Sequence, residues 1–148
     1  ERVVIMTDAD VDGAHIAALL ITFFYRYTPG LIEAGRLYMA MPPLYKMSQG
    51  NKIIYALDDA QREELMATEF TGKGKVEIGR FKGLGEMNPA QLKVTTMNPA
   101  TRTLARITID VEDAMTTESL VETLMGKKSE LRYEYIQEHA QFVDVNGV

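Results

Sequence analysis

The chain of 148 residues has about the length of one domain, and its 46% hydrophobic and 25% charged residues are typical of a globular protein with a buried core. It contains no cysteine, which excludes disulfides, zinc–thiolate sites and iron–sulfur clusters. No apolar stretch is long enough for a membrane-spanning helix, so no membrane partner is expected. The net charge of −5 argues against a general polyanion binder, although a local basic segment can oppose the total.

The first two expected elements are a strand and a helix. The apolar run Val3 to Met6 predicts a strand buried on both faces of a parallel sheet. Apolar residues from Ile16 to Tyr27 repeat with helical spacing, and Pro29-Gly30 ends this helix. Strand, turn and helix together form half of a βαβ unit, which indicates an α/β fold. Because a strand begins almost at residue 1, without an initiator methionine or a signal peptide, we interpret the chain as a fragment of a longer protein.

The rest of the chain predicts short strands and helices bounded by turn and capping residues. The expected elements are a strand over 37–41, a hairpin of strands over 44–47 and 53–57, a helix over 58–68, a strand over 76–81, a helix from 89, a strand over 104–109 and helices over 120–125 and 129–139. Two of the helices begin with capping boxes, in which Asp58 pairs with Gln61 and Asn88 with Gln91. The tail from residue 143 is expected to be loose.

Three acidic residues, Asp8, Asp10 and Asp12, follow the first strand. In an extended segment such residues point to one side, where three carboxylates repel one another unless a cation binds them. The carboxyl end of a strand in an open α/β sheet is also where ligands bind. Oxygen ligands without Cys or His nearby favour Mg²⁺, with Mn²⁺ or Ca²⁺ as substitutes. The alternative is a structural module, in which Asp12 caps the following helix.

The pattern Asp-x-Asp-x-Asp-Gly also begins an EF-hand calcium loop. In that motif the twelfth position needs a bidentate Glu, but here it is Leu19. A strand rather than a helix precedes the loop, so we reject an EF-hand.

Acidic residues with Mg²⁺ at a strand end are typical of phosphoryl transfer. Carboxylates that hold a metal supply no nucleophile, and no Ser-His-Asp or Cys-His combination is evident, so we assign no catalytic residue in this chain. A small phosphatase with Asp8 as its nucleophile would need a helix-borne Lys and a second acidic pair, and no convincing pair is found.

Between Lys73 and Lys93 the charge reverses, with five basic and two acidic residues. Arg80 and Lys82 flank Phe81, and Gly83-Leu84-Gly85 permits close approach of the backbone to a phosphate. Together with a metal site in the same domain, this loop indicates contact with a nucleic-acid backbone. We expect the loop to be separate from the acidic residues.

Three motifs occur together and in order: Thr7-Asp8-Ala9-Asp10-Val11-Asp12-Gly13-Ala14-His15-Ile16, Pro42-Pro43-Leu44-Tyr45-Lys46 and Arg80-Phe81-Lys82-Gly83-Leu84-Gly85-Glu86-Met87-Asn88. In this combination the chain resembles, over essentially its whole length, the C-terminal part of the B subunit of bacterial type IIA DNA topoisomerases. The resemblance implies an α/β Toprim domain with a largely parallel sheet over residues 1–97. It also implies a mixed α+β tail over residues 98–148 that packs on this domain and on the partner subunit.

The resemblance also implies roles for individual residues. Asp8 and Asp10 match the family's Mg²⁺ ligands, and Asp12 is a further acid of the same cluster. Lys82 and His15 match positions near bound DNA, and Arg80 lies beside Lys82 in the same motif.

Some parts of the family's machinery are not in this sequence. They are the Toprim glutamate, the ATP-binding region and the nucleophilic tyrosine, which belongs to the family's A subunit. The resemblance implies an A2B2 heterotetramer in the bacterial cytoplasm, associated with the nucleoid, that passes one DNA duplex through a transient break in another. The fragment alone is therefore expected to be inactive. The short spacing from Tyr45 to Arg80 and the sequence of residues 125–132 favour topoisomerase IV over gyrase.

Overall fold

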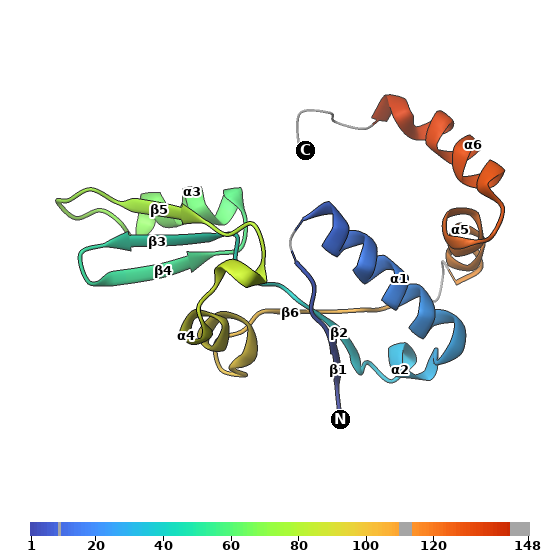
Figure 1. The fold of residues 1–148 in the computed structure, drawn as a ribbon, viewed down its shortest axis with the longest axis horizontal. Helices are drawn as coiled ribbons and strands as arrows, with labels where there is room; N and C mark the ends of the chain where they lie inside the picture. The colour runs from blue at the N-terminus through green and yellow to red at the C-terminus, as the bar shows by residue number, and fades with distance from the viewer. Residues whose placement is uncertain (9, 110–113, 143–148) are drawn as a thin grey trace.

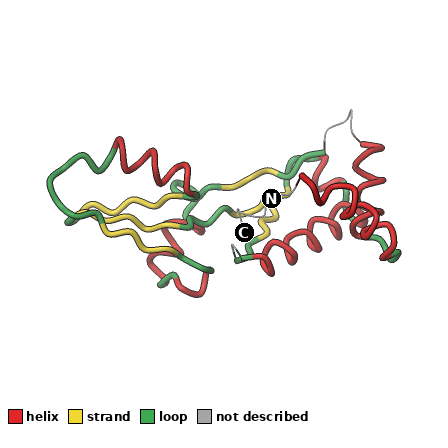
Figure 2. Tube along the Cα trace, turned by 90° about the horizontal axis from the view of Figure 1, so that it is seen from above, coloured by secondary structure: helices red, strands yellow, loops and turns green. Residues whose placement is uncertain are grey.

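The computed structural model describes residues 1–8, 10–109 and 114–142. Its helices and strands are, in chain order, β1 (Val3–Ile5), α1 (Val11–Tyr27), α2 (Gly30–Glu33), β2 (Leu37–Ala40), β3 (Tyr45–Gln49), β4 (Lys52–Ala56), α3 (Asp59–Thr68), β5 (Glu77–Arg80), the 3₁₀ turn η1 (Leu84–Glu86), α4 (Pro89–Leu92), the π-helical turn η2 (Lys93–Met97), β6 (Leu104–Arg106), α5 (Ala114–Met125), α6 (Ser129–His139) and the 3₁₀ turn η3 (Ala140–Phe142). The strands form two sheets, and the second sheet lies at the opposite end of the molecule from α5 and α6 (Figures 1 and 2).

The first sheet has the order β1-β2-β6. β1 and β2 are parallel, because α1 and α2 carry the chain back between them, and β6 runs antiparallel to β2. Its core consists of four buried residues, Ile5, Ala17, Ile32 and Leu37. This sheet therefore places the carboxyl end of β1 at the start of α1.

Helix α1 begins directly after Asp10. The Asp10 Oδ1 atom accepts a hydrogen bond of 2.7 Å from the Gly13 backbone N–H, which satisfies one of the free donors at the helix start. At the other end, the Thr28 N–H donates to the Phe24 carbonyl and Pro29 follows. The face of α1 that carries Ala17 packs on the first sheet.

The second sheet is antiparallel, with the order β4-β3-β5. Its core contains Tyr45, Met47, Ala56 and Phe70, with Leu65 of α3 packed against them. The expected capping box of α3 is present in a shifted form. Asp58 Oδ1 accepts from the Gln61 N–H at 2.8 Å, but the Gln61 side chain accepts from the Leu57 N–H instead of that of Asp58.

Of the two C-terminal helices, α6 matches its predicted boundaries, whereas α5 begins at Ala114, six residues before the predicted start at residue 120. The Asn88–Gln91 capping box is complete at the start of α4, and α6 covers residues 129–139 as predicted. α5 is joined to α1 by an ion pair of 2.9 Å between Glu122 and Arg26. The predicted tail from residue 143 lies outside the described residues.

The structure defines the strand pairing in more detail than the sequence. Within the described residues the expected parallel pairing is present between β1 and β2, whereas β6 runs antiparallel to β2 and the second sheet is antiparallel throughout. The strand expected over 104–109 ends at Arg106.

Within the described residues, no helix combines the length and apolar character needed to cross a membrane.

Candidate functional site

The carboxylates of Asp8 and Asp10 lie between the end of β1 and the start of α1. Each carboxylate accepts one backbone hydrogen bond of 2.7 Å through its Oδ1 atom. Asp10 accepts from the Gly13 N–H, and Asp8 accepts from the Leu84 N–H. Within the described residues, neither Oδ2 atom accepts a hydrogen bond. Each carboxylate is thus fixed through one oxygen and retains a second for a ligand.

Asp8 and Asp10 both line one hollow of about 380 Å³. Most of its other lining is apolar, including Met39, Met41 and Leu44, and the N-cap residue Asp58 of α3 also lines it. The hollow is therefore bounded by the first sheet, by α1 and by the chain that leads into the second sheet.

Asp12 does not join this pair. It is the second residue of α1 and does not line the hollow, and Asp10 rather than Asp12 caps the helix, so the capping role expected for Asp12 is wrong. The physical reason is that the extended segment ends at Asp10, where the alternation of side chains gives way to helical rotation. Among the described residues, no three acidic or histidine side chains are grouped to hold a metal ion.

Two carboxylates nevertheless fit a magnesium ion. Mg²⁺ keeps several water ligands and is usually bound through only one or two carboxylates. The donor set at Asp8 and Asp10 consists of hard oxygen atoms, which suits Mg²⁺ or Mn²⁺ better than zinc.

The three sequence motifs meet around these aspartates. The basic loop, residues 80–87, reaches Asp8 through the Leu84 N–H. The Phe81 N–H donates to the Leu44 carbonyl at 2.8 Å. A small hollow between the proline motif and the loop is lined by Pro42, Pro43, Phe81, Gly83, Leu84 and Met87. The expectation that the loop is separate from the acidic residues is therefore wrong.

The basic loop is held at both ends and within itself. The side chains of Phe81 and Met87 are buried. Between them, Glu86 Oε2 accepts a hydrogen bond of 2.7 Å from the Lys82 backbone N–H. The side chains of Arg80 and Lys82 are exposed, so the loop presents its charges to solvent while its backbone faces Asp8.

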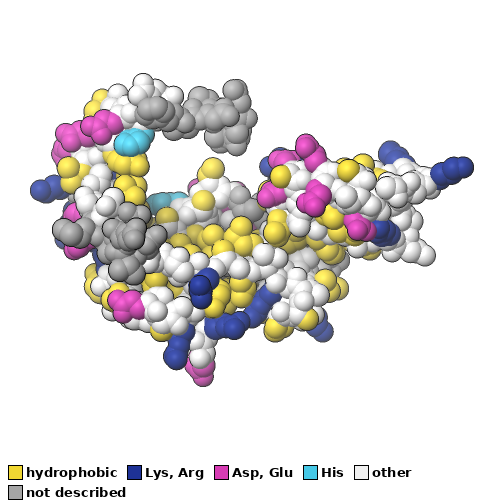
Figure 3. Space-filling model, turned by 180° about the vertical axis from the view of Figure 1, so that it is seen from behind, with side chains coloured by type: hydrophobic (Ala, Val, Ile, Leu, Met, Phe, Trp, Pro, Cys, Tyr) yellow, Lys and Arg dark blue, Asp and Glu magenta, His cyan; other side chains and the backbone are white. Residues whose placement is uncertain are grey.

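Two further basic residues of the segment 73–93, Lys73 and Lys75, lie outside the basic loop. Lys73 and Lys75 lie before β5, where Gln49 donates to the carbonyls of Gly72 and Gly74. This is the outer end of the second sheet, where Figure 3 shows basic side chains.

His15 is exposed on α1, one turn beyond Asp12, and no hydrogen bond within the described residues joins it to the basic loop.

Two glycines permit this close packing. A Cβ atom at Gly13 would lie 2.0 Å from the backbone oxygen of Asp8, which no side chain can tolerate without movement. At Gly83 it would lie 3.0 Å from Asp8 Oδ1. The sequence signalled Gly83 through the Gly-x-Gly pattern, but it gave no sign that the neighbour would be Asp8, or that the Glu86 carboxylate would bind the Lys82 N–H.

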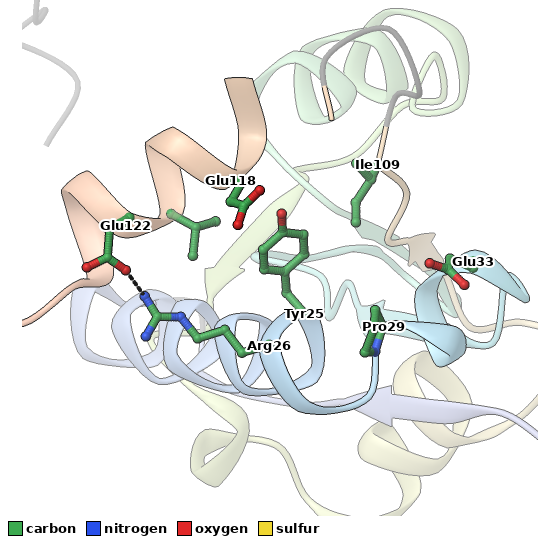
Figure 4. A pocket seen from close by; sticks show the side chains of 8 residues that line it. Tyr25, Arg26, Pro29, Glu33, Ile109, Glu118 and Glu122 are labelled. Carbon is green, nitrogen blue, oxygen red and sulfur yellow. Dashed lines mark hydrogen bonds and ion pairs between the residues drawn. The ribbon is translucent and has the colours of Figure 1, made fainter. Parts of the chain in front are cut away.

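A second hollow, of about 610 Å³, lies away from these residues, between α1, α2 and α5 (Figure 4). It contains Tyr25 and three glutamates, with Arg26 paired to Glu122 across it. None of the predicted site residues lines it.

Comparison with known proteins assigns these features to a family. Residues 1–42 match the Toprim domain, and residues 73–137 match the carboxyl terminus of the DNA gyrase B subunit. The chain is 61% identical over 144 residues to the B subunit of DNA topoisomerase 4 from Bartonella bacilliformis, which covers 97% of the chain and 21% of that protein. It is 62% identical over 146 residues to the corresponding protein of Caulobacter vibrioides, an alignment that covers 99% of the chain and 21% of that protein. It is 52% identical over 142 residues to the B subunit of DNA gyrase from Halalkalibacterium halodurans, with 96% of the chain and 22% of that protein covered.

The chain belongs to the B subunits of type IIA DNA topoisomerases. It spans about one fifth of the length of the curated relatives it matches. The Toprim match contains Asp8 and Asp10, and the gyrase B match contains the basic loop. The hydrogen bond from Leu84 to Asp8 therefore joins the two segments that define the chain as a member of this topoisomerase family.

The expected division into residues 1–97 and 98–148 stays a prediction. The Toprim match ends at residue 42, and β6, which follows residue 97, pairs with β2 in the first sheet.

Proposed function

We propose that this chain is the cation-binding part of a type IIA topoisomerase B subunit, in which Asp8 and Asp10 hold Mg²⁺ and the basic loop contacts the DNA backbone. The observation that carries the proposal is the contact between Asp8 and the loop. It joins the Asp8 carboxylate, two residues before Asp10, to the loop that carries the exposed side chains of Arg80 and Lys82. The two features suit metal-assisted chemistry on a phosphodiester, because a metal ion stabilises charge on the reacting oxygens and basic side chains position the backbone.

The chain's own residues have two tasks in this scheme. Asp8 and Asp10 hold the cation through the oxygens that do not bind backbone N–H groups, while Arg80 and Lys82 neutralise phosphates and fix the DNA in register. When bound, Mg²⁺ stabilises the negative charge that develops on the reacting phosphate oxygens. The tyrosine that attacks the phosphate is supplied by the A subunit, within an A2B2 assembly that acts on chromosomal DNA in the cytoplasm and binds ATP outside these 148 residues.

Within the family, topoisomerase IV is the specific activity that we propose, with decatenation and relaxation as its reactions. Two relatives named as B subunits of topoisomerase 4 are 61% and 62% identical to the chain. The gyrase relative from Halalkalibacterium halodurans is 52% identical, the same as the more distant topoisomerase 4 relatives at 52% to 53%. Negative supercoiling by the assembled full-length enzyme would instead identify gyrase.

One observation favours a purely structural role. Both Oδ1 atoms already bind backbone N–H groups, so Asp8 and Asp10 could serve only to tether the basic loop and to cap α1. A structural module of this kind would need no cation.

The test uses the full-length B subunit in complex with the A subunit. Asp8→Asn and Asp10→Asn each remove one negative charge but keep an oxygen that accepts the backbone N–H. We expect both to reduce Mg²⁺-dependent DNA cleavage at least 100-fold. Asp58→Asn is the matched control, because Asp58 lines the same hollow and is also an N-cap. Cleavage by both variants at the level of the control would overturn the metal site and leave the structural role.

A further inference from the structure

The backbone of the basic loop touches Asp8 at two consecutive residues. The Leu84 N–H donates to Asp8 Oδ1 at 2.7 Å. The neighbouring Gly83 lies so close that a Cβ atom there would be 3.0 Å from Oδ1 and 3.2 Å from Oδ2. Gly83 has φ −166° and ψ 174°, an extended conformation open to any residue. Glycine is therefore favoured at this position by the close approach of the Asp8 carboxylate, which a Cβ atom would push aside by a few tenths of an ångström, and not by the backbone conformation.

The loop is built to hold this contact in place. Phe81 and Met87 are buried on either side of Gly83-Leu84, and the Glu86 carboxylate binds the Lys82 N–H. The Met87 N–H donates to the Leu84 carbonyl at 3.1 Å. The same short segment thus fixes the Leu84 donor and the backbone of Lys82.

We propose that the Gly83-Leu84 backbone is a positioning element that orients the Asp8 carboxylate for a divalent cation and thereby couples cation binding to the placement of Lys82. The proposal rests on the proposed function, in which Asp8 is a cation ligand and Lys82 contacts DNA. By reciprocity, DNA bound at Lys82 then strengthens cation binding at Asp8 by the same factor that the cation strengthens DNA binding. Removal of a group that orients a metal ligand typically lowers metal affinity 10- to 100-fold.

Two substitutions at residue 84 separate the donor from the side chain. Leu84→Pro removes the N–H and the leucine side chain, and Leu84→Ala removes only the side chain. Proline fits the backbone here, because Leu84 is the first residue of η1 and Gly83 before it is extended. The proline Cδ atom takes the place of the hydrogen that points at Asp8 Oδ1, so this variant both removes the donor and displaces the carboxylate. The difference between the two variants therefore reports the whole backbone contact with Asp8.

The measurement is Mn²⁺ binding to the full-length complex of the B and A subunits, without nucleotide, followed by electron paramagnetic resonance. It is made with and without a DNA duplex. We expect Leu84→Pro to raise the Kd for Mn²⁺ about 10-fold, and Leu84→Ala to leave it within about twofold of wild type. DNA should tighten Mn²⁺ binding in wild type and in Leu84→Ala but not in Leu84→Pro. Equal Kd values and equal DNA responses in the two variants would overturn the proposal.

A second pair of variants decides the matter if Leu84→Pro does not fold. Gly83→Ala places a methyl group against the Asp8 carboxylate, whereas Gly85→Ala, in the same loop, meets no atom within 4 Å. We expect only Gly83→Ala to weaken Mn²⁺ binding, and equal binding by both would overturn the proposal.

Asp8→Asn separates the failure of this inference from the failure of the proposed function. If Asp8→Asn leaves Mn²⁺ binding unchanged, Asp8 is no ligand and both proposals fall. If Asp8→Asn weakens binding but Leu84→Pro and Gly83→Ala do not, only the positioning role is wrong.

Discussion

Asp10 has two separable roles, as the N-cap of α1 and as a proposed cation ligand. Its Oδ1 atom accepts the Gly13 N–H at 2.7 Å, and loss of such a cap costs about 1 kcal/mol of helix stability. Asn and Ser are good N-caps without a carboxylate, whereas Ala is a poor one. We therefore expect Asp10→Ala to lose the cap and the ligand, and Asp10→Asn and Asp10→Ser to lose only the ligand.

The cap is measured by hydrogen exchange of the first-turn amides of α1 in the full-length protein, which reports local opening. A loss of about 1 kcal/mol lowers protection roughly fivefold in Asp10→Ala, and protection in Asp10→Asn should stay within about twofold of wild type. Mn²⁺ binding should fall in all three variants. Equal loss of protection in Asp10→Asn and Asp10→Ala would refute the capping role, and unchanged Mn²⁺ binding in Asp10→Ser would refute the ligand role.

Three further predictions follow from other contacts. Lys82→Ala should weaken DNA binding equally across sequences and reduce the slope of log K against log salt by about 0.9; a sequence-dependent loss in a filter-binding titration would indicate base readout instead. Gly13→Ala should abolish DNA cleavage, because its Cβ would lie 2.0 Å from the Asp8 carbonyl oxygen, and full cleavage would show that the Asp8 backbone moves freely. Glu122→Gln should lower the free energy of unfolding, measured in urea, by less than about 1 kcal/mol, because the side chains of Glu122 and Arg26 are 61% and 37% exposed. A larger loss would mean that this ion pair holds α5 in place.

Local signals predicted the elements of the fold well. The capping box of Asn88 and Gln91 and the turn between β3 and β4 depend on residues close in sequence, and both are confirmed. The helical spacing from Ile16 predicted α1, but the helix starts earlier, at Val11, because the cap at Asp10 closes its first turn. The pairing of β2 with β6 was not predicted, because it depends on residues more than 60 positions apart.

The candidate site was predicted only in part. Residue type and position after β1 indicated Asp8 and Asp10, and the structure places both on one hollow. Extended-strand geometry also included Asp12, which lies in the first turn of α1 and does not line the hollow, because the pattern alone does not show where the extended segment ends and the helix begins. Its place among the metal ligands stays a prediction. The contact between Asp8 and Leu84 joins residues 76 positions apart through a backbone donor, which no side-chain pattern can reveal.

Anomalous diffraction from crystals of the full-length protein grown with Mn²⁺ tests the central claim most directly. If Asp8 and Asp10 form the cation site, a manganese peak should lie in direct contact with both carboxylates, while the Leu84 N–H still binds Asp8 Oδ1. A manganese peak bound elsewhere, with both aspartates contacting only backbone N–H groups, would contradict it.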